Sequence, residues 1–214
     1  MIRVIHPLII PIYAFAFYIE LERQSYSIDL IPVLIIIAMT AILSWITMRI
    51  SREACHNNGN DLDPLTNINA GIKPRLIVAT GLTIAYISAH LMCIRMQTAY
   101  NWGISLVFPI FIIPTWINVL SGRGLQNLMP GMEGKFPANI CLAPASYLGT
   151  LSAFTIILGH KNSADTFILF TITMLLTAIE AHHHMARHNG RLSHILYGYL
   201  IGIIPSIIIM FIFA

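Results

Sequence analysis

Long apolar runs are the feature of this chain that most restricts its fold. A helix that crosses a bilayer needs about 20 mainly apolar residues, because it rises about 1.5 Å per residue across roughly 30 Å of hydrocarbon. Seven stretches approach that length, namely 4–19, 30–48, 76–94, 104–120, 140–158, 166–179 and 195–213. The chain is 57% hydrophobic and only 10% charged, too few charges for an ordinary globular surface. The sequence therefore predicts an integral membrane protein, an all-α transmembrane bundle formed as one domain over residues 1–214.

The number of spans depends on the fourth stretch. Pro109 and Pro114 lie inside it, and proline removes a backbone N–H donor and breaks or kinks a helix. The first, fourth and sixth stretches are also the shortest. Six spans with one re-entrant or interfacial segment are therefore the alternative to seven spans.

Positive charge is unevenly divided between the two sides that seven spans would create. Nine of the 12 Lys and Arg residues fall on the side of the amino terminus: Arg3, Arg49, Arg52, Lys73, Arg75, Arg123, Lys135, Arg187 and Arg191. The other side holds Arg23, Arg95 and Lys161. The positive-inside rule then predicts a cytoplasmic amino terminus. The polar connections 49–75, 121–139 and 180–194 share that side, so chemistry is expected there.

The segment 180–194 contains five of the nine histidines of the chain. If the sixth helix continues through it, Glu180, His184 and His188 lie on one face at i, i+4 and i+8, an arrangement that can hold a metal. Two alternatives remain open. The imidazoles can form an interfacial cluster at the lipid headgroups, or they can belong to a phosphate-handling site.

Two cations stand at the start of the third predicted span. Lys73 and Arg75 flank Pro74 there, beside the free backbone N–H groups of a helix amino terminus. That position suits a bound anion better than a structural cation. The alternative is an ordinary basic flank that fixes the orientation of the span.

Several short motifs resemble a known family. The chain has His-Pro-Leu at 6–8 and Pro-x-Tyr at 11–13, and near its other end it has Ala-Arg at 186–187, then His194 and Gly202. In this order they resemble the small Bacteroidetes branch of the type 2 phosphatidic acid phosphatase (PAP2) superfamily. The resemblance implies a helical membrane enzyme of the bacterial inner membrane that acts on a lipid phosphate.

The three superfamily signatures, which together surround one phosphate, are incomplete here. In the first, Lys73-Pro74 stands for Arg-Pro, and Thr66 occupies the position of the Lys. In the second, residues 135–140 offer Asn139 or Ile140 in place of a histidine. In the third, Arg187 precedes His194 by one residue too many, His188 occupies the strict Arg position and Gly198 replaces an Asp.

The resemblance implies a role for each matching residue. His194 would be the nucleophile, with His188 and Asn139 as the other catalytic residues. The phosphate would be bound by Lys73, Arg75, Lys135, Arg187 and Arg191. The usual general acid and the orienting carboxylate are missing, and loss of a general acid alone costs about 10² to 10⁴ in rate. The resemblance therefore implies either a weak phosphatase or a relative that binds without turnover, with isoprenoid or glycerolipid phosphates as substrates.

Partners follow from the same reasoning. Membrane lipids are expected, whereas no cofactor and no nucleic-acid partner is. Two other classes of function remain open. One is a metal- or haem-handling membrane protein or small transporter that uses Glu180, His184, His188 and His90. The other is a non-catalytic subunit of a membrane assembly.

Overall fold

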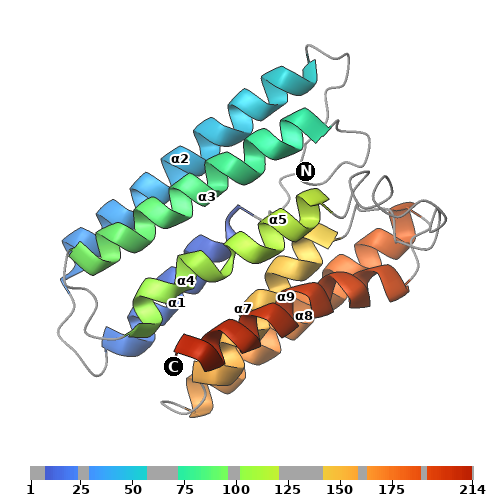
Figure 1. The fold of residues 1–214 in the computed structure, drawn as a ribbon. Coiled ribbons are helices and arrows are strands. Elements are labelled where there is room, and N and C mark those ends of the chain that lie inside the picture. The colour runs from blue at the N-terminus through green and yellow to red at the C-terminus, as the bar shows by residue number, and fades with distance from the viewer. Residues whose placement is uncertain are drawn as a thin grey trace.

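The computed structural model describes residues 8–23, 29–56, 72–95, 102–120, 142–158, 163–188 and 192–213, and its regular structure there is helical (Figure 1). The helices are α1 (Ile10–Arg23), α2 (Leu30–His56), α3 (Ile72–Arg95), α4 (Trp102–Ile110), α5 (Ile112–Leu120), α7 (Leu142–Leu158), α8 (Ser163–His188) and α9 (Leu192–Phe213). The predicted all-α class is confirmed, and each apolar run contains a helix or a pair of helices.

Several helices continue beyond the apolar runs. α2 extends to His56 and α8 to His188, both well past the last apolar residue of the run. These extensions contain Arg, Glu, Ala and His, most of which tolerate helical conformation well. At the other end of the chain, α1 begins at Ile10, later than the run at residue 4 suggested, and Pro11 occupies its first turn, where a missing N–H costs nothing.

The fourth run is a broken helix. α4 and α5 have nine residues each and meet at Phe111, because Pro114 cannot donate a hydrogen bond to the carbonyl of Ile110. The chain tightens at the break: the Phe111 N–H donates to the Phe108 carbonyl at 3.0 Å. The Phe111 carbonyl in turn accepts bonds from the Thr115 N–H at 3.3 Å and the Thr115 hydroxyl at 2.7 Å.

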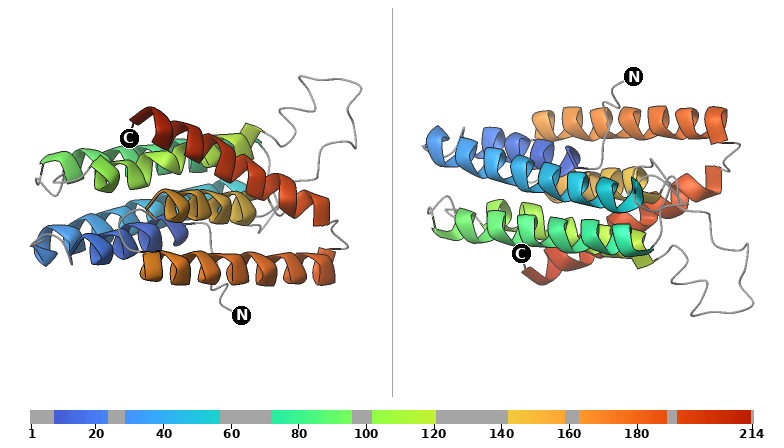
Figure 2. Two further views of the ribbon diagram at one scale, coloured as in Figure 1. Left: turned by 90° about the horizontal axis from the view of Figure 1, so that it is seen from below. Right: turned by 90° about the horizontal axis from the view of Figure 1, so that it is seen from above.

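α7 lies at the centre of the described bundle. Every side chain that the structure describes in it, from residue 145 to residue 155, is buried. α7 packs against α8 and α9 on one side, and α2 pairs with α3 on the other side of the bundle. α1, α4 and α5 lie between these two groups, and α1 and α5 also contact α7 (Figures 1 and 2). The residues of α7 are mostly small or hydroxylated, which permits close contact on all sides.

Two glycines allow α7 and α9 to approach at backbone distance. A Cβ atom at Gly202 of α9 would overlap the Ser146 carbonyl oxygen, and one at Gly149 of α7 would overlap the Tyr199 carbonyl oxygen. The Thr150 hydroxyl donates across the crossing to the Gly202 carbonyl at 3.3 Å. Inside a membrane the hydrophobic effect does not drive helices together, so their association depends on the close van der Waals packing that small residues permit at a crossing.

The outer surface of the bundle is apolar. Large aliphatic and aromatic side chains are exposed on α2, α8 and α9, with Phe211 79% and Phe167 70% exposed. Such a surface is unstable in water and suited to lipid. Within the described residues, Leu30–Cys55, Lys73–Arg95 and Ile195–Ile212 are long and apolar enough to cross a membrane, with mean hydropathies of 2.4, 1.8 and 2.4. These three long helices indicate an integral membrane protein.

Candidate functional site

The helix ends that border the three polar connections lie at one end of the bundle. α2 ends and α3 begins there, α5 ends and α7 begins there, and α8 ends and α9 begins there (the right-hand end in Figure 1 and in the left view of Figure 2). These helix ends border residues 57–71, 121–141 and 189–191, which lie outside the described residues. Arg23 and Arg95 end α1 and α3 at the opposite end.

Lys73 and Arg75 occupy the first turn of α3, as the sequence suggested, but their environments differ. Lys73 is exposed, whereas Arg75 is 7% exposed and packed within the bundle. Between them, the Pro74 carbonyl accepts a hydrogen bond from the Ser51 hydroxyl of α2 at 2.8 Å. This bond fixes the start of α3 against α2. A ligand in water can therefore reach Lys73 directly, while Arg75 belongs to the packed structure beneath it.

Three predicted residues lie at the junction of α8 and α9. Arg187 and His188 are in the last turn of α8, and His194 is in the first turn of α9, which begins at Leu192. Their side chains lie outside the described residues. Their backbone positions are at the same end of the bundle as Lys73 and Arg75 (Figure 1).

The other predicted residues are outside the described part of the chain. These are Lys135, Asn139 and Arg191. Their assignment to the site stays a prediction. The same applies to Thr66 and Ile140, at which the signatures of the resembled family are altered.

The helix on which the metal hypothesis depends is present. α8 is continuous through His188, so Glu180, His184 and His188 lie on one helix at i, i+4 and i+8. Among the residues whose side chains the structure describes, no group of three His, Cys, Asp or Glu could hold a metal, and these three fall outside that set. His90 lies 17 positions after Lys73 on α3, about 25 Å along the helix from the polar end. It therefore cannot join a site at the end of α8.

A buried polar network at the centre of the bundle was not predicted from the sequence. The hydroxyls of Thr115 on α5 and Tyr147 on α7 are hydrogen-bonded to each other. The Asn118 amide donates to the Ser146 hydroxyl at 2.8 Å, which adds a second link between α5 and α7. The Trp116 indole N–H donates to a Thr83 hydroxyl on α3 at 2.9 Å.

The sequence signal for this network is modest but present. Asn118 is the one amide side chain in an apolar run of 104–120, and 140–158 is rich in Ser, Thr and Gly. Polar groups inside a membrane need partners within the protein, because no water competes there. Hydroxyl and amide pairs between helices typically stabilise a bundle by about 0.6 kcal/mol each. The network therefore joins α3, α5 and α7. Which residues pair across these three helices could not be predicted from the sequence alone.

Comparison of the chain with models of protein families, with curated proteins and with solved structures gave no match. The functional interpretation consequently depends on the residues and their placement.

Proposed function

We propose that this chain is a polytopic protein of the bacterial inner membrane, with six or seven spans, that binds the phosphate group of a membrane-embedded lipid. It hydrolyses the phosphoester slowly or retains binding without turnover, as the similarity to PAP2 phosphatases implies. The observation that best supports this proposal is the position of six helix ends, which border three polar connections distant in sequence, at one end of the bundle.

The proposed spans include helices shorter than the three long ones. Ile10–Glu20, Leu106–Val119 and Thr166–Ile179 are shorter apolar helices, and α7 has 17 residues. α7 is buried by its neighbours rather than by lipid, so it needs less hydrophobicity to remain in the membrane. The broken α4 and α5 pair gives the seventh span or, in the six-span arrangement, a segment that enters the membrane and is shielded by protein.

Each residue has a defined task in the proposed reaction. Exposed Lys73, beside the free N–H groups of α3, binds phosphate oxygens together with Arg187 and Arg191. Buried Arg75 supports this site from beneath, and Lys135 adds a further cation. A positively charged rim of this kind stabilises the charge that the transferring phosphoryl group develops.

Covalent catalysis by His194 would proceed in two steps. A ring nitrogen of His194 attacks phosphorus, an N–P bond forms and the P–O bond to the lipid alcohol breaks. A proton from His188, assisted by a hydrogen bond from Asn139, neutralises the leaving alkoxide. Water then hydrolyses the phosphohistidine to release inorganic phosphate. Because His188 is not the usual general acid of the family, a slow reaction is expected.

Phosphate release from defined lipids tests the catalytic part of this proposal. The purified protein, reconstituted in mixed micelles, is assayed with phosphatidic acid and with an isoprenoid monophosphate. His194→Ala should lower the rate at least a hundredfold, because it removes the nucleophile. Arg95→Gln, at the opposite end of α3, is the matched control and should leave the rate unchanged. An equal rate in His194→Ala and the parent would refute the assignment.

Binding is measured separately, so that a relative without turnover is also tested. A non-hydrolysable phosphonate analogue of phosphatidic acid should bind the parent more tightly than diacylglycerol does. Lys73→Gln should weaken the binding of the phosphonate severalfold by removing an exposed charge. If the parent neither releases phosphate nor prefers the phosphonate, the proposed function is wrong.

The continuous α8 favours one other candidate, a metal site on Glu180, His184 and His188. Elemental analysis of protein purified without added metal tests it. A stoichiometric transition metal that is lost in His184→Ala would support this candidate over phosphate binding, and its absence would remove it. An absorption spectrum of the same protein tests haem binding, and a Soret band would support the haem version of this candidate.

A further inference from the structure

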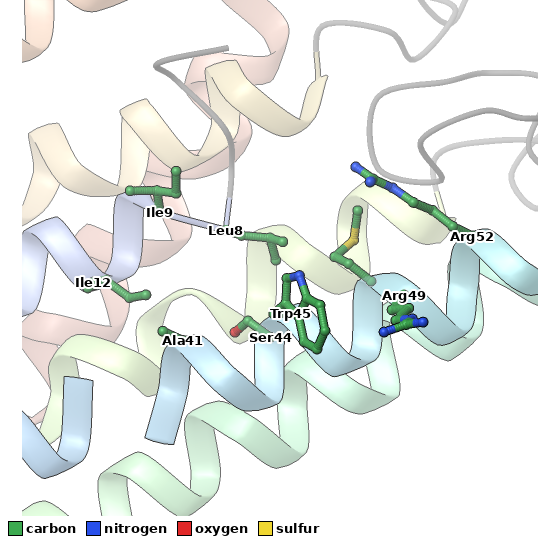
Figure 3. Close-up of a pocket in the computed structure, with 9 residues that line it drawn as sticks. Leu8, Ile9, Ile12, Ala41, Ser44, Trp45, Arg49 and Arg52 are labelled. Atoms are coloured by element: carbon green, nitrogen blue, oxygen red, sulfur yellow. The ribbon is translucent and has the colours of Figure 1, made fainter. Parts of the chain in front are cut away.

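A groove lies between the start of α1 and the second half of α2 (Figure 3). Leu8 and Ile12 form one wall, and Ala41, Trp45 and Met48 form the other. Its volume is about 480 Å³, within the range of roughly 300 to 1,000 Å³ typical of ligand pockets. Most of the lining is apolar, so the groove suits a hydrocarbon chain.

The groove opens on a surface of α2 that is suited to lipid. Ile42, Ile46 and Ile50 are 56%, 40% and 51% exposed on the same helix. Trp45, which lines the groove, is itself 60% exposed, and tryptophan is enriched where membranes meet water. A molecule can therefore enter from the bilayer without crossing water.

Two arginines, Arg49 and Arg52, lie at one end of the groove, beyond Trp45 in Figure 3. The guanidinium of Arg49 lies 5.5 Å from the centroid of the Trp45 ring, and its Nε is 3.6 Å from a Glu53 carboxylate oxygen. Arg52 has no ion-pair partner among the residues that the structure describes. Within the described part of the chain, one positive charge thus remains uncompensated at this end, and an anion would balance it.

A buried hydroxyl marks the middle of the groove. Ser44 is 2% exposed and lines the groove, and among the described residues its Oγ has no hydrogen-bond partner. Thr40 and Thr47 on the same helix both donate to carbonyls one turn earlier, at 2.7 and 2.8 Å. A buried hydroxyl without a partner is costly, and a ligand carbonyl would satisfy it.

The order of groups along α2 matches one chemical class. Apolar residues come first, then the hydroxyl of Ser44, then Arg49 about 7.5 Å further along the helix. A glycerophospholipid has the same order of acyl chain, ester carbonyl and phosphate. We propose that the groove binds one anionic glycerophospholipid from the bilayer, with its phosphate at Arg49 and Arg52 and an ester carbonyl at Ser44. This lipid is bound without being hydrolysed, and the inference does not depend on the proposed phosphatase function.

Native mass spectrometry of the full chain in a non-ionic detergent tests this proposal. Phosphatidylglycerol and phosphatidylcholine with identical acyl chains are added in equal amounts. The parent should retain one phosphatidylglycerol roughly twentyfold better than phosphatidylcholine, because each surface arginine contributes about a fivefold preference for anionic lipid. In Arg49→Gln/Arg52→Gln this preference should almost disappear, so that the two lipids are retained about equally. Both positions are exposed, so the fold should persist.

Matched variants separate this groove from other cationic sites. Arg95→Gln removes one exposed cation at the opposite end of α3 and should change nothing. Ala41→Leu fills the groove with both arginines intact and should lower retention of the lipid severalfold. Equal retention of the two lipids by the parent would overturn the proposal. An unchanged preference for phosphatidylglycerol in the double arginine variant would also overturn it. The same holds if Lys73→Gln loses this preference while the double arginine variant keeps it.

Discussion

Replacing Gly202 with alanine adds one methyl group where α9 crosses α7. A Cβ atom there would lie 2.7 Å from the Ser146 carbonyl carbon and 2.8 Å from the Thr150 nitrogen. Carbon atoms normally pack at about 3.5 to 4.0 Å, so the two helices must separate locally by roughly 1 Å. Because both neighbours are backbone atoms, no change of rotamer can relieve the overlap.

The cost of Gly202→Ala follows from three contributions. Overpacking of this kind costs about 1 to 3 kcal/mol, and loss of the 3.3 Å bond from the Thr150 hydroxyl adds about 0.6 kcal/mol. Alanine regains about 1 kcal/mol over glycine inside a helix. We therefore expect the free energy of unfolding to fall by about 0.6 to 2.6 kcal/mol, and the melting temperature by about 1 to 10 °C for a chain of this size.

Thermal unfolding in one detergent, followed by circular dichroism, measures this effect, and Gly81→Ala is the matched comparison. A Cβ at Gly81 would meet the side chain of Thr47, whose own Cβ is 3.0 Å away. Adding Thr47→Ala to Gly81→Ala should therefore recover much of its loss, whereas Gly202→Ala has no side chain to remove. A Gly202→Ala protein that melts at or above the temperature of the parent would show that the close crossing of α7 and α9 is wrong.

Two further predictions concern hydrogen bonds between helices. Thr115→Val and Tyr147→Phe, combined in a double-mutant cycle, should show a coupling energy of about 0.6 to 1.7 kcal/mol in the free energy of unfolding; additive losses would show that the hydroxyl pair contributes nothing. Ser51→Ala should lower the same free energy by about 0.5 to 1.5 kcal/mol, because it removes the bond between α2 and the start of α3. Its melting curve should match that of the parent if this bond does not form.

The local structure was largely predictable, because hydrophobicity and proline act on neighbouring residues. The apolar runs located the helices. Pro109 and Pro114 marked the fourth run as irregular; the structure keeps Pro109 inside α4 and places the break at Phe111, before Pro114. The charged extensions of α2 to His56 and α8 to His188 were not predicted, because an apolar run indicates which residues lie in the hydrocarbon core and does not indicate where the helix ends. The sequence also proposed Lys73 and Arg75 as equivalent cations, whereas packing of α3 against α2 buries Arg75.

The sequence by itself determined that this chain is helical and belongs in a membrane. Both properties follow from runs of consecutive apolar residues, which favour lipid over water and, within lipid, must form their backbone hydrogen bonds inside a helix. The arrangement was decided by tertiary structure. The strongly apolar α2 and α9 present large exposed faces, while α7, with its Ser, Thr and Gly, is central. Lipid is as apolar as leucine, so helices gain little by burying aliphatic side chains against one another. Which helices pack together is instead decided by close backbone contact and by hydrogen bonds such as that from Asn118 to Ser146. These contacts join residues on different helices, so they depend on the tertiary arrangement.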